Sequence, residues 1–176
     1  RQGVLQQITN TSGVGYEVFT SPTMNSSGSL YAFSSVNTIS GANPNGTHNV
    51  FLYDDLNGSF TAVTENAHWL RKTWPDLSAN GTHIAFEGDR EIVRYDIAAN
   101  TYTIMPGVPI WGSERPSIDA DGSRIAFFSD GDLTGGNPFN NLEVFLASCS
   151  APTPTPTPTP AKPTPAPTPN TPVGFD

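Results

Sequence analysis

The sequence predicts an all-β fold built from a repeated unit of four short strands. A twelve-residue segment occurs three times in register, as "PTMNSSGSLYAF" from Pro22, "PDLSANGTHIAF" from Pro75 and "PSIDADGSRIAF" from Pro116. After each copy comes a strand-like apolar segment: "NVFLYD", "EIVRYD" and "EVFLAS", which begin at Asn49, Glu91 and Glu143. Short apolar runs bounded by turn residues are typical of strands, and their recurrence indicates a repeat architecture.

Each copy of the twelve-residue segment is predicted to be a β-hairpin. A glycine at its seventh position allows positive φ without a steric penalty, and the residue before it can bond its own backbone. These turn residues are Ser27 with Gly28, Asn80 with Gly81, and Asp121 with Gly122. The strand that leaves each turn ends in Ala-Phe, a small and large pair that suits a packed sheet.

A fourth strand is predicted after the first two units, in "GSFTAVT" from Gly58 and "NTYTIMP" from Asn100. The third unit has no such segment before a proline-rich tail. The segment "GVLQQIT", Gly3 to Thr9, matches "GSFTAVT" in length and in its terminal Gly and Thr. We therefore expect the chain to begin with strand four of one unit and to end after strand three of another. It would hold three four-stranded units, out of phase.

Units of about 40 to 50 residues with four strands are typical of the blades of a β-propeller. The pattern "PxhSxDGxxIAF" followed by "EhFLYD" resembles the TolB-type, WD40-like PD40 repeat family of bacterial propellers, and this resemblance covers residues 1–150. It implies a propeller fold and leaves the function open. A β-sandwich with coincidental hairpins is the rival interpretation.

Three blades are too few to close a ring, because propellers usually have four to eight. One interpretation, which the sequence favours, is that the chain is part of a larger propeller. In the other, two copies close into six blades, and the Gly3–Thr9 strand of each completes the last blade of the other. Such closure would cover the exposed sheet edges.

Composition excludes some partners and indicates a location. The net charge is -8 with a pI of about 4.6, so no basic surface is expected to bind nucleic acid. No apolar run is long enough to span a bilayer. Only 14% of residues are charged, and Ser, Thr, Asn and Gly fill the polar positions, which is typical of secreted or cell-surface proteins. Since the chain starts at Arg1, it is interpreted as a processed piece of a longer protein, and its single cysteine, Cys149, cannot form an internal disulfide.

Residues 151–176 are predicted to be a separate, extended segment. They hold ten of the 17 prolines, mostly alternating with threonine. Alternating proline forbids helix and sheet hydrogen bonding and favours a polyproline II rod. We expect a stalk or linker, O-glycosylated at Thr153, Thr155, Thr157, Thr159, Thr164 and Thr168.

The connections between blades carry the candidate binding residues. In propellers these connections border the mouth of the central channel, where an aromatic ring from each blade and nearby cations would bind a protein or a glycan. The predicted ligand-binding residues are Tyr16, Trp69, Arg71, Trp111 and Arg115. The alternative is that the rings pack between blades.

A calcium site is a second candidate. The long loop between Phe127 and Val144 carries Asp130, Asp132 and Asn137, whose oxygen atoms are the ligand type that calcium prefers. The alternative is that these side chains shape turns. No other cofactor is predicted.

No catalytic motif is present, so the protein is predicted not to be an enzyme. The predicted function is a non-catalytic module that binds protein or glycan. The first alternative is a structural protomer that assembles through incomplete blades into a ring or fibre. The second is a propeller glycosidase that uses paired carboxylates such as Glu17 and Glu114.

Overall fold

The computed structural model describes residues 3–11, 20–105 and 112–149, and the predicted all-β fold is confirmed there. Eleven strands lie in these ranges, and they form three antiparallel sheets. Within the same ranges there is no helix long and apolar enough to cross a membrane.

The strands follow the predicted units closely. Those of the first sheet are β1 (Thr20–Met24), β2 (Leu30–Ser35), β3 (Asn49–Asp54) and β4 (Ser59–Ala62). Those of the second sheet are β5 (Lys72–Leu77), β6 (His83–Gly88), β7 (Glu91–Asp96) and β8 (Thr101–Ile104). Those of the third are β9 (Ser113–Ile118), β10 (Arg124–Ser129) and β11 (Glu143–Ser148).

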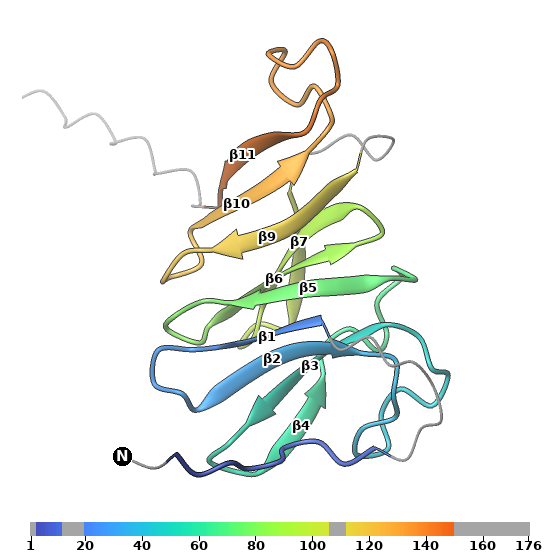
Figure 1. Ribbon diagram of the computed structural model, residues 1–176, viewed down its shortest axis with the longest axis vertical. Helices are drawn as coiled ribbons and strands as arrows, with labels where there is room; N and C mark the ends of the chain where they lie inside the picture. Colours follow the sequence, from blue (N-terminus) through green and yellow to red (C-terminus); the bar gives the residue numbers. More distant parts are fainter. Residues whose placement is uncertain (1–2, 12–19, 106–111, 150–176) are drawn as a thin grey trace, which may run out of the picture.

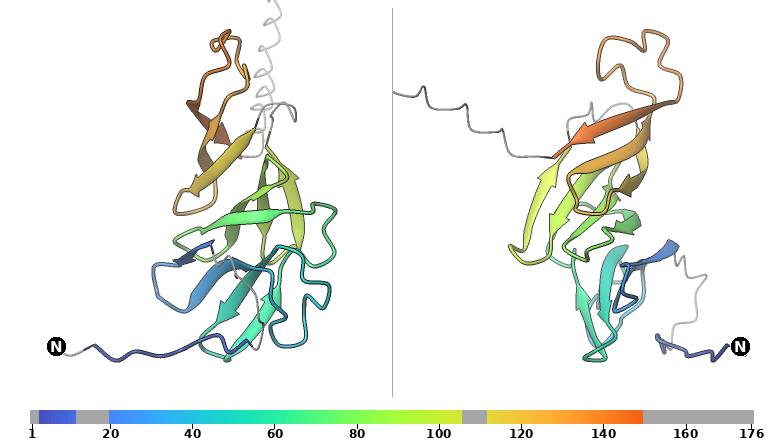
Figure 2. Two further views of the ribbon diagram at one scale, coloured as in Figure 1. Left: turned by 45° about the vertical axis from the view of Figure 1, so that its right-hand side comes forward. Right: turned by 90° about the vertical axis from the view of Figure 1, so that its left-hand side faces the viewer.

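Each sheet is a meander whose spatial order equals its order in the sequence, and we call the three sheets blades 1, 2 and 3. They follow one another along the long axis of the molecule (Figure 1), and the side views in Figure 2 show the same succession. The first strands of neighbouring blades lie together, because β1 contacts β5 and β5 contacts β9. We call β1, β5 and β9 the inner strands, and they form one side of the molecule.

The predicted hairpin turns are confirmed. Gly28, Gly81 and Gly122 all have positive φ, between 70° and 80°, and each donates its N–H to the carbonyl three residues earlier. Neighbouring turns also bond to each other, since Ser26 N donates to Ala79 O at 2.9 Å and Asn80 N donates to Ala120 O at 3.0 Å. The turns of adjacent blades are therefore joined by backbone hydrogen bonds.

The hydrophobic core lies between blades, and each blade contributes two faces to it. We call the face turned toward the following blade the front face and the other the back face. In the core between blades 1 and 2, the front face supplies Ala32, Val50 and Leu52, and the back face supplies Ile84, Phe86, Val93 and Tyr95. A second core joins blades 2 and 3 in the same way, around Ala85, Ile92, Ile125 and Phe127.

Blade 3 has three strands, as predicted, but the prediction of a strand at Gly3–Thr9 is wrong for the single chain. Residues 3–11 form no strand. A strand needs a neighbour to receive its backbone hydrogen bonds. The unpaired edge that lacks a fourth strand is β11, which lies at the opposite end of the molecule from this segment (Figure 1).

The predicted tail, residues 151–176, lies outside the described residues, as do the six threonines predicted to be O-glycosylated. The two long loops are confirmed between β2 and β3 and between β10 and β11, whereas Asp89 and Arg90 alone join β6 to β7. Both residues of that short turn have positive φ, 48° and 76°, as a two-residue hairpin turn requires.

Candidate functional site

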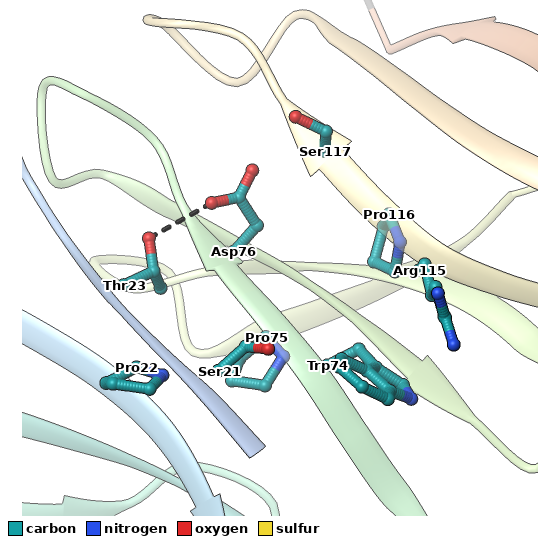
Figure 3. Close-up of a pocket in the computed structure, with 9 residues that line it drawn as sticks. All are labelled: Ser21, Pro22, Thr23, Trp74, Pro75, Asp76, Arg115, Pro116 and Ser117. Atoms are coloured by element: carbon teal, nitrogen blue, oxygen red, sulfur yellow. Dashed lines mark hydrogen bonds between the residues drawn. The ribbon is translucent and has the colours of Figure 1, made fainter.

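The three inner strands together line one open pocket of about 450 Å³. Each contributes a tripeptide centred on the proline that begins the twelve-residue repeat. The lining residues are Ser21, Pro22 and Thr23 of β1, Trp74, Pro75 and Asp76 of β5, and Arg115, Pro116 and Ser117 of β9 (Figure 3). We call this the inner-strand pocket.

A β-bulge in each inner strand shapes this pocket. In all three blades the register shifts so that two residues of the inner strand, the proline and the residue before it, lie opposite a single residue of the neighbouring strand. The residue before the proline has positive φ each time: 29° at Ser21, 52° at Trp74 and 53° at Arg115. Steric contact with proline disfavours helical geometry at that position, and left-handed geometry costs on the order of 1–3 kcal/mol for a residue other than glycine. The rest of each blade must hold this backbone in place.

Asp76 connects the three inner strands. One carboxylate oxygen accepts a hydrogen bond from Thr23 Oγ1 on β1 at 3.0 Å, and the other accepts from Ile118 N on β9 at 2.8 Å. Figure 3 shows the Asp76 side chain between β1 and β9. Both oxygens are thus engaged in holding neighbouring blades together, which fixes the spacing of the pocket walls.

The largest side chains of the pocket form a pair. The Arg115 guanidinium lies 4.9 Å from the centre of the Trp74 ring, within the range of a cation–π interaction. Arg115 also approaches the carboxylate of Glu114 at 3.8 Å in an exposed ion pair. The Trp74 ring is half-buried, and Arg115 is exposed. The pocket therefore presents an aromatic ring and a cation from adjacent blades.

A second, charged pocket of about 230 Å³ lies where blades 2 and 3 meet, around the connections to β5 and β9. Its lining residues are Arg71, Glu87, Arg90, Gly112, Ser113, Glu114, Asp130 and Leu142. Glu87 is 5% exposed, and burial raises the pKa of its carboxyl group above the ordinary value for a glutamate. The cations Arg71 and Arg90 act in the opposite direction, and the carboxylate of Glu114 adds to the rise.

The raised pKa of Glu87 predicts a pH-dependent stability. Stability from a raised carboxyl pKa is complete below the ordinary pKa and is lost as the pH rises through the raised value. We therefore expect Glu87→Gln, which cannot ionise, to be more stable than the wild type at neutral pH. Urea unfolding should show this difference shrinking toward zero as the pH falls to about 4. A difference that is constant with pH, or that grows toward low pH, would contradict the assignment.

Trp69, predicted as a ligand-binding ring, is instead part of the core between blades 1 and 2, at 3% exposure. Its ring meets Phe86 and Tyr102 edge to face, at centroid distances of 5.6 and 5.5 Å, and its Nε1 donates to Glu91 Oε2 at 2.7 Å. The alternative interpretation of the sequence, packing between blades, therefore describes this residue. Tyr16 and Trp111 lie outside the described residues.

Of the remaining predicted residues, Arg115 lines the inner-strand pocket and Arg71 lines the charged pocket. Trp74 and Asp76 were not predicted from the sequence. The rings that were predicted lie five or six residues before each repeat proline, whereas Trp74 and Asp76 are directly beside Pro75. A signal was present in the repeated proline itself, since proline inside a strand marks an edge or a bulge.

In the loop predicted to bind calcium, the side chains bond to the loop itself. Asp132 Oδ1 accepts from Asn137 N at 2.7 Å, and Asn137 Nδ2 donates to Asn141 O at 2.7 Å. Asn43 makes the matching bond to Thr47 O in the sister loop. Among the residues that the structure describes, no group of three His, Cys, Asp or Glu side chains is arranged to hold a metal ion. A calcium site that includes Asp130 stays a prediction.

Comparison by sequence finds no matching protein family and no matching curated protein. Comparison by structure finds TolB from Acinetobacter baumannii, with 18% identity and a TM-score of 0.51 over 81% of this chain. A putative TolB from Agrobacterium tumefaciens has 17% identity and a TM-score of 0.56 over 81% of this chain. The fold is a β-propeller fold. An oligogalacturonate lyase from Vibrio parahaemolyticus is also similar, with 11% identity and a TM-score of 0.54 over 80% of this chain.

This β-propeller chain spans only part of those structures. It covers 31% of the Acinetobacter protein, 48% of the Agrobacterium protein and 40% of the lyase. At these identities the similarity shows the propeller fold alone, and the function must be argued from the site.

Proposed function

We propose that this chain is a non-catalytic β-propeller module that binds a partner protein through the inner-strand pocket. The module would act outside the cell or at its surface, displayed on the Pro-Thr segment 151–176. The weakly charged, Ser-, Thr- and Asn-rich composition supports this location. Glycan binding at the same pocket is the alternative ligand class.

The repeated strained bulge is the observation that carries the proposal. Three blades share one backbone geometry at this position, yet they place three different side chains on it, those of Ser21, Trp74 and Arg115. A constant backbone that presents variable side chains on a concave surface is how repeat proteins build binding surfaces. Strained residues and bulges also cluster at functional sites, since the strain must be offset by the surrounding structure.

The chemistry of the pocket favours a protein ligand. Tryptophan and arginine are the residue types most enriched among those that dominate protein–protein affinity, and here they stand in contact. Both oxygens of Asp76 already accept hydrogen bonds from the protein, which leaves the carboxylate in a structural role. The three prolines restrict the backbone, so little conformational entropy is lost when a ligand binds.

The test is to probe the labelled protein against a synthetic peptide array and an oligosaccharide array. We expect binding to peptides, and we expect Trp74→Ala and Arg115→Ala each to weaken it by about tenfold or more, as loss of a dominant contact does. Leu56→Ala is the matched control, because Leu56 is 82% exposed in the β3–β4 turn and lies outside the pocket.

Two outcomes would contradict this proposal in different ways. Binding to oligosaccharides that Trp74→Ala abolishes would confirm the pocket and reject the protein ligand. Peptide binding that both pocket variants retain at wild-type strength would reject the pocket.

A further inference from the structure

The front face of blade 3 carries the same apolar residues as the front face of blade 1, but nothing in the described chain covers it. Strand equivalence through the repeat pairs Val50 with Val144 and Leu52 with Leu146. In blade 1 the exposed fractions of these side chains are 0% and 9%, because blade 2 packs on them. In blade 3 they are 68% and 63%, and the neighbouring Phe128 is 38% exposed. The front face of blade 3 is therefore as apolar as the faces buried between blades, but no described blade packs on it.

The N-terminal segment, residues 3–9, has the sequence and packing position of the fourth strand of a blade, but it belongs to no sheet. Alignment of "GVLQQIT" with "GSFTAVT" makes Ile8 equivalent to Val63, and strand pairing makes Val63 equivalent to Met105. Val63 and Met105 each follow the fourth strand of a blade, and each packs into the core that this blade forms with the next. Ile8 does the same, because it packs against the back face of blade 1, on the cluster of Phe33, Ile39, Phe51 and Tyr53.

This segment nevertheless belongs to no sheet, and part of its apolar surface is exposed. Val63 N donates to Val50 O at 2.9 Å, and Met105 N donates to Ile92 O at 2.7 Å. Residues 3–11 are in no strand, and Leu5 is 100% exposed. Between the segment and blade 1 lies a cavity of about 250 Å³ with an almost wholly apolar lining, made by Ile8, Thr9, Pro22, Tyr31 and Phe33.

We propose that a second copy of this chain docks here, front face of blade 3 against back face of blade 1, and that its β11 pairs with Gly3–Thr9. The described residues of each chain hold eleven strands and one fourth-strand sequence that belongs to no sheet, which together have the strands of three complete blades. Two copies related by a twofold axis then close six blades, within the usual range for propellers. The N-terminal segment already lies on its own blade 1, so the partner has only to bring β11 alongside it.

The equivalent strands in blades 1 and 2 set the register of this pairing. Asp54 lies opposite Ser59, and Tyr53 opposite Phe60, in the antiparallel pair of β3 and β4. The same register places Leu5 of one copy opposite Ala147 of the other. It also directs Ile8 N to Val144 O, as Val63 N is directed to Val50 O. Leu5 then becomes buried beside Ala147, which already packs on the core between blades 2 and 3.

The first experiment measures the solution mass of the full chain by sedimentation or light scattering. We expect twice the 18.7 kDa chain mass at about 100 µM, a concentration that saturates an interface of micromolar affinity. Leu146→Asp should weaken dimer formation by about a hundredfold or more, because it desolvates a charge in an apolar interface. Leu146 is 63% exposed, so the variant should keep the wild-type circular dichroism spectrum.

The second experiment tests the register by disulfide trapping. In a Cys149→Ala background, Leu5→Cys with Ala147→Cys should give a covalent dimer on mild oxidation, because directly opposite residues are about 4.5–5.5 Å apart. The matched control is Leu5→Cys with the natural Cys149, the only cysteine in the chain, which lies two positions along the same face. Its expected cross-linking is much slower.

Each alternative result overturns the proposal. A folded chain that remains monomeric at every concentration would reject docking of a second copy. Open oligomers larger than a dimer would reject closure by two copies. Equal trapping of the two cysteine pairs would reject the register.

Discussion

Replacing Trp69 by alanine is expected to lower the free energy of unfolding by about 3–5 kcal/mol, the range for removal of a large buried aromatic ring. The ring is 3% exposed and fills the core between blades 1 and 2. The variant would lose two edge-to-face contacts, with Phe86 and Tyr102, and would leave the Glu91 carboxylate without its indole donor. Urea unfolding followed by circular dichroism measures the change.

Trp74→Ala is the matched control, because it removes the same type of side chain from a half-buried position in the inner-strand pocket. It should lower the free energy of unfolding far less than Trp69→Ala does, and its main effect should be weaker ligand binding. The two tryptophans therefore separate packing from recognition. If Trp69→Ala were as stable as the wild type and lost binding instead, the ring would have the ligand-binding role that the sequence predicted for it.

Gly122→Ala is expected to be markedly more destabilising than the same change at the equivalent turn position, Gly28. Both glycines have positive φ, 80° and 70°, where an L-residue costs roughly 1–2 kcal/mol. A Cβ at Gly28 would meet nothing within 4 Å. At Gly122 it would overlap His83 Nδ1 and lie 2.9 Å from His83 Cβ, so both the imidazole and its attachment must shift. We expect this overpacking to add about 1–3 kcal/mol.

The pair is measured by thermal or urea unfolding of both variants under one condition. The backbone penalty is common to both, so their difference reports the contact between the blade 3 turn and His83 of blade 2. Equal destabilisation would contradict the close packing of these two blades. A second check is Gly122→Ala combined with His83→Ala, which should recover the part of the difference that comes from contact with the imidazole ring.

Turns and strand positions were predictable because they depend on residues close together in the sequence. The repeated Gly28, Gly81 and Gly122 each allow a left-handed turn that only a few residue types tolerate, and the flanking runs show the alternation of strands. The count of strands per unit followed from the same repeat. The structural comparisons then confirmed the propeller fold that this pattern predicted.

The candidate site was less predictable, because its residues meet only when three blades pack. Trp74 and Arg115 are 41 positions apart and lie on different sheets, and Asp76 joins β1 to β9 across β5. No local pattern shows which aromatic ring enters the core and which lines a pocket. Trp69 and Trp74, five residues apart, are separated only by burial.

The repeated four-strand units can be recognised from the amino-acid sequence alone, since hairpin geometry is a local property of the backbone. Which faces of those units are buried and which line a pocket depends on how the blades pack. Inner strands from three blades converge on one pocket, while the back face of blade 1 and the front face of blade 3 lie at opposite ends of the molecule (Figure 1). Gly3–Thr9 has the sequence of a strand and is not one, because a strand exists only where another strand accepts its hydrogen bonds.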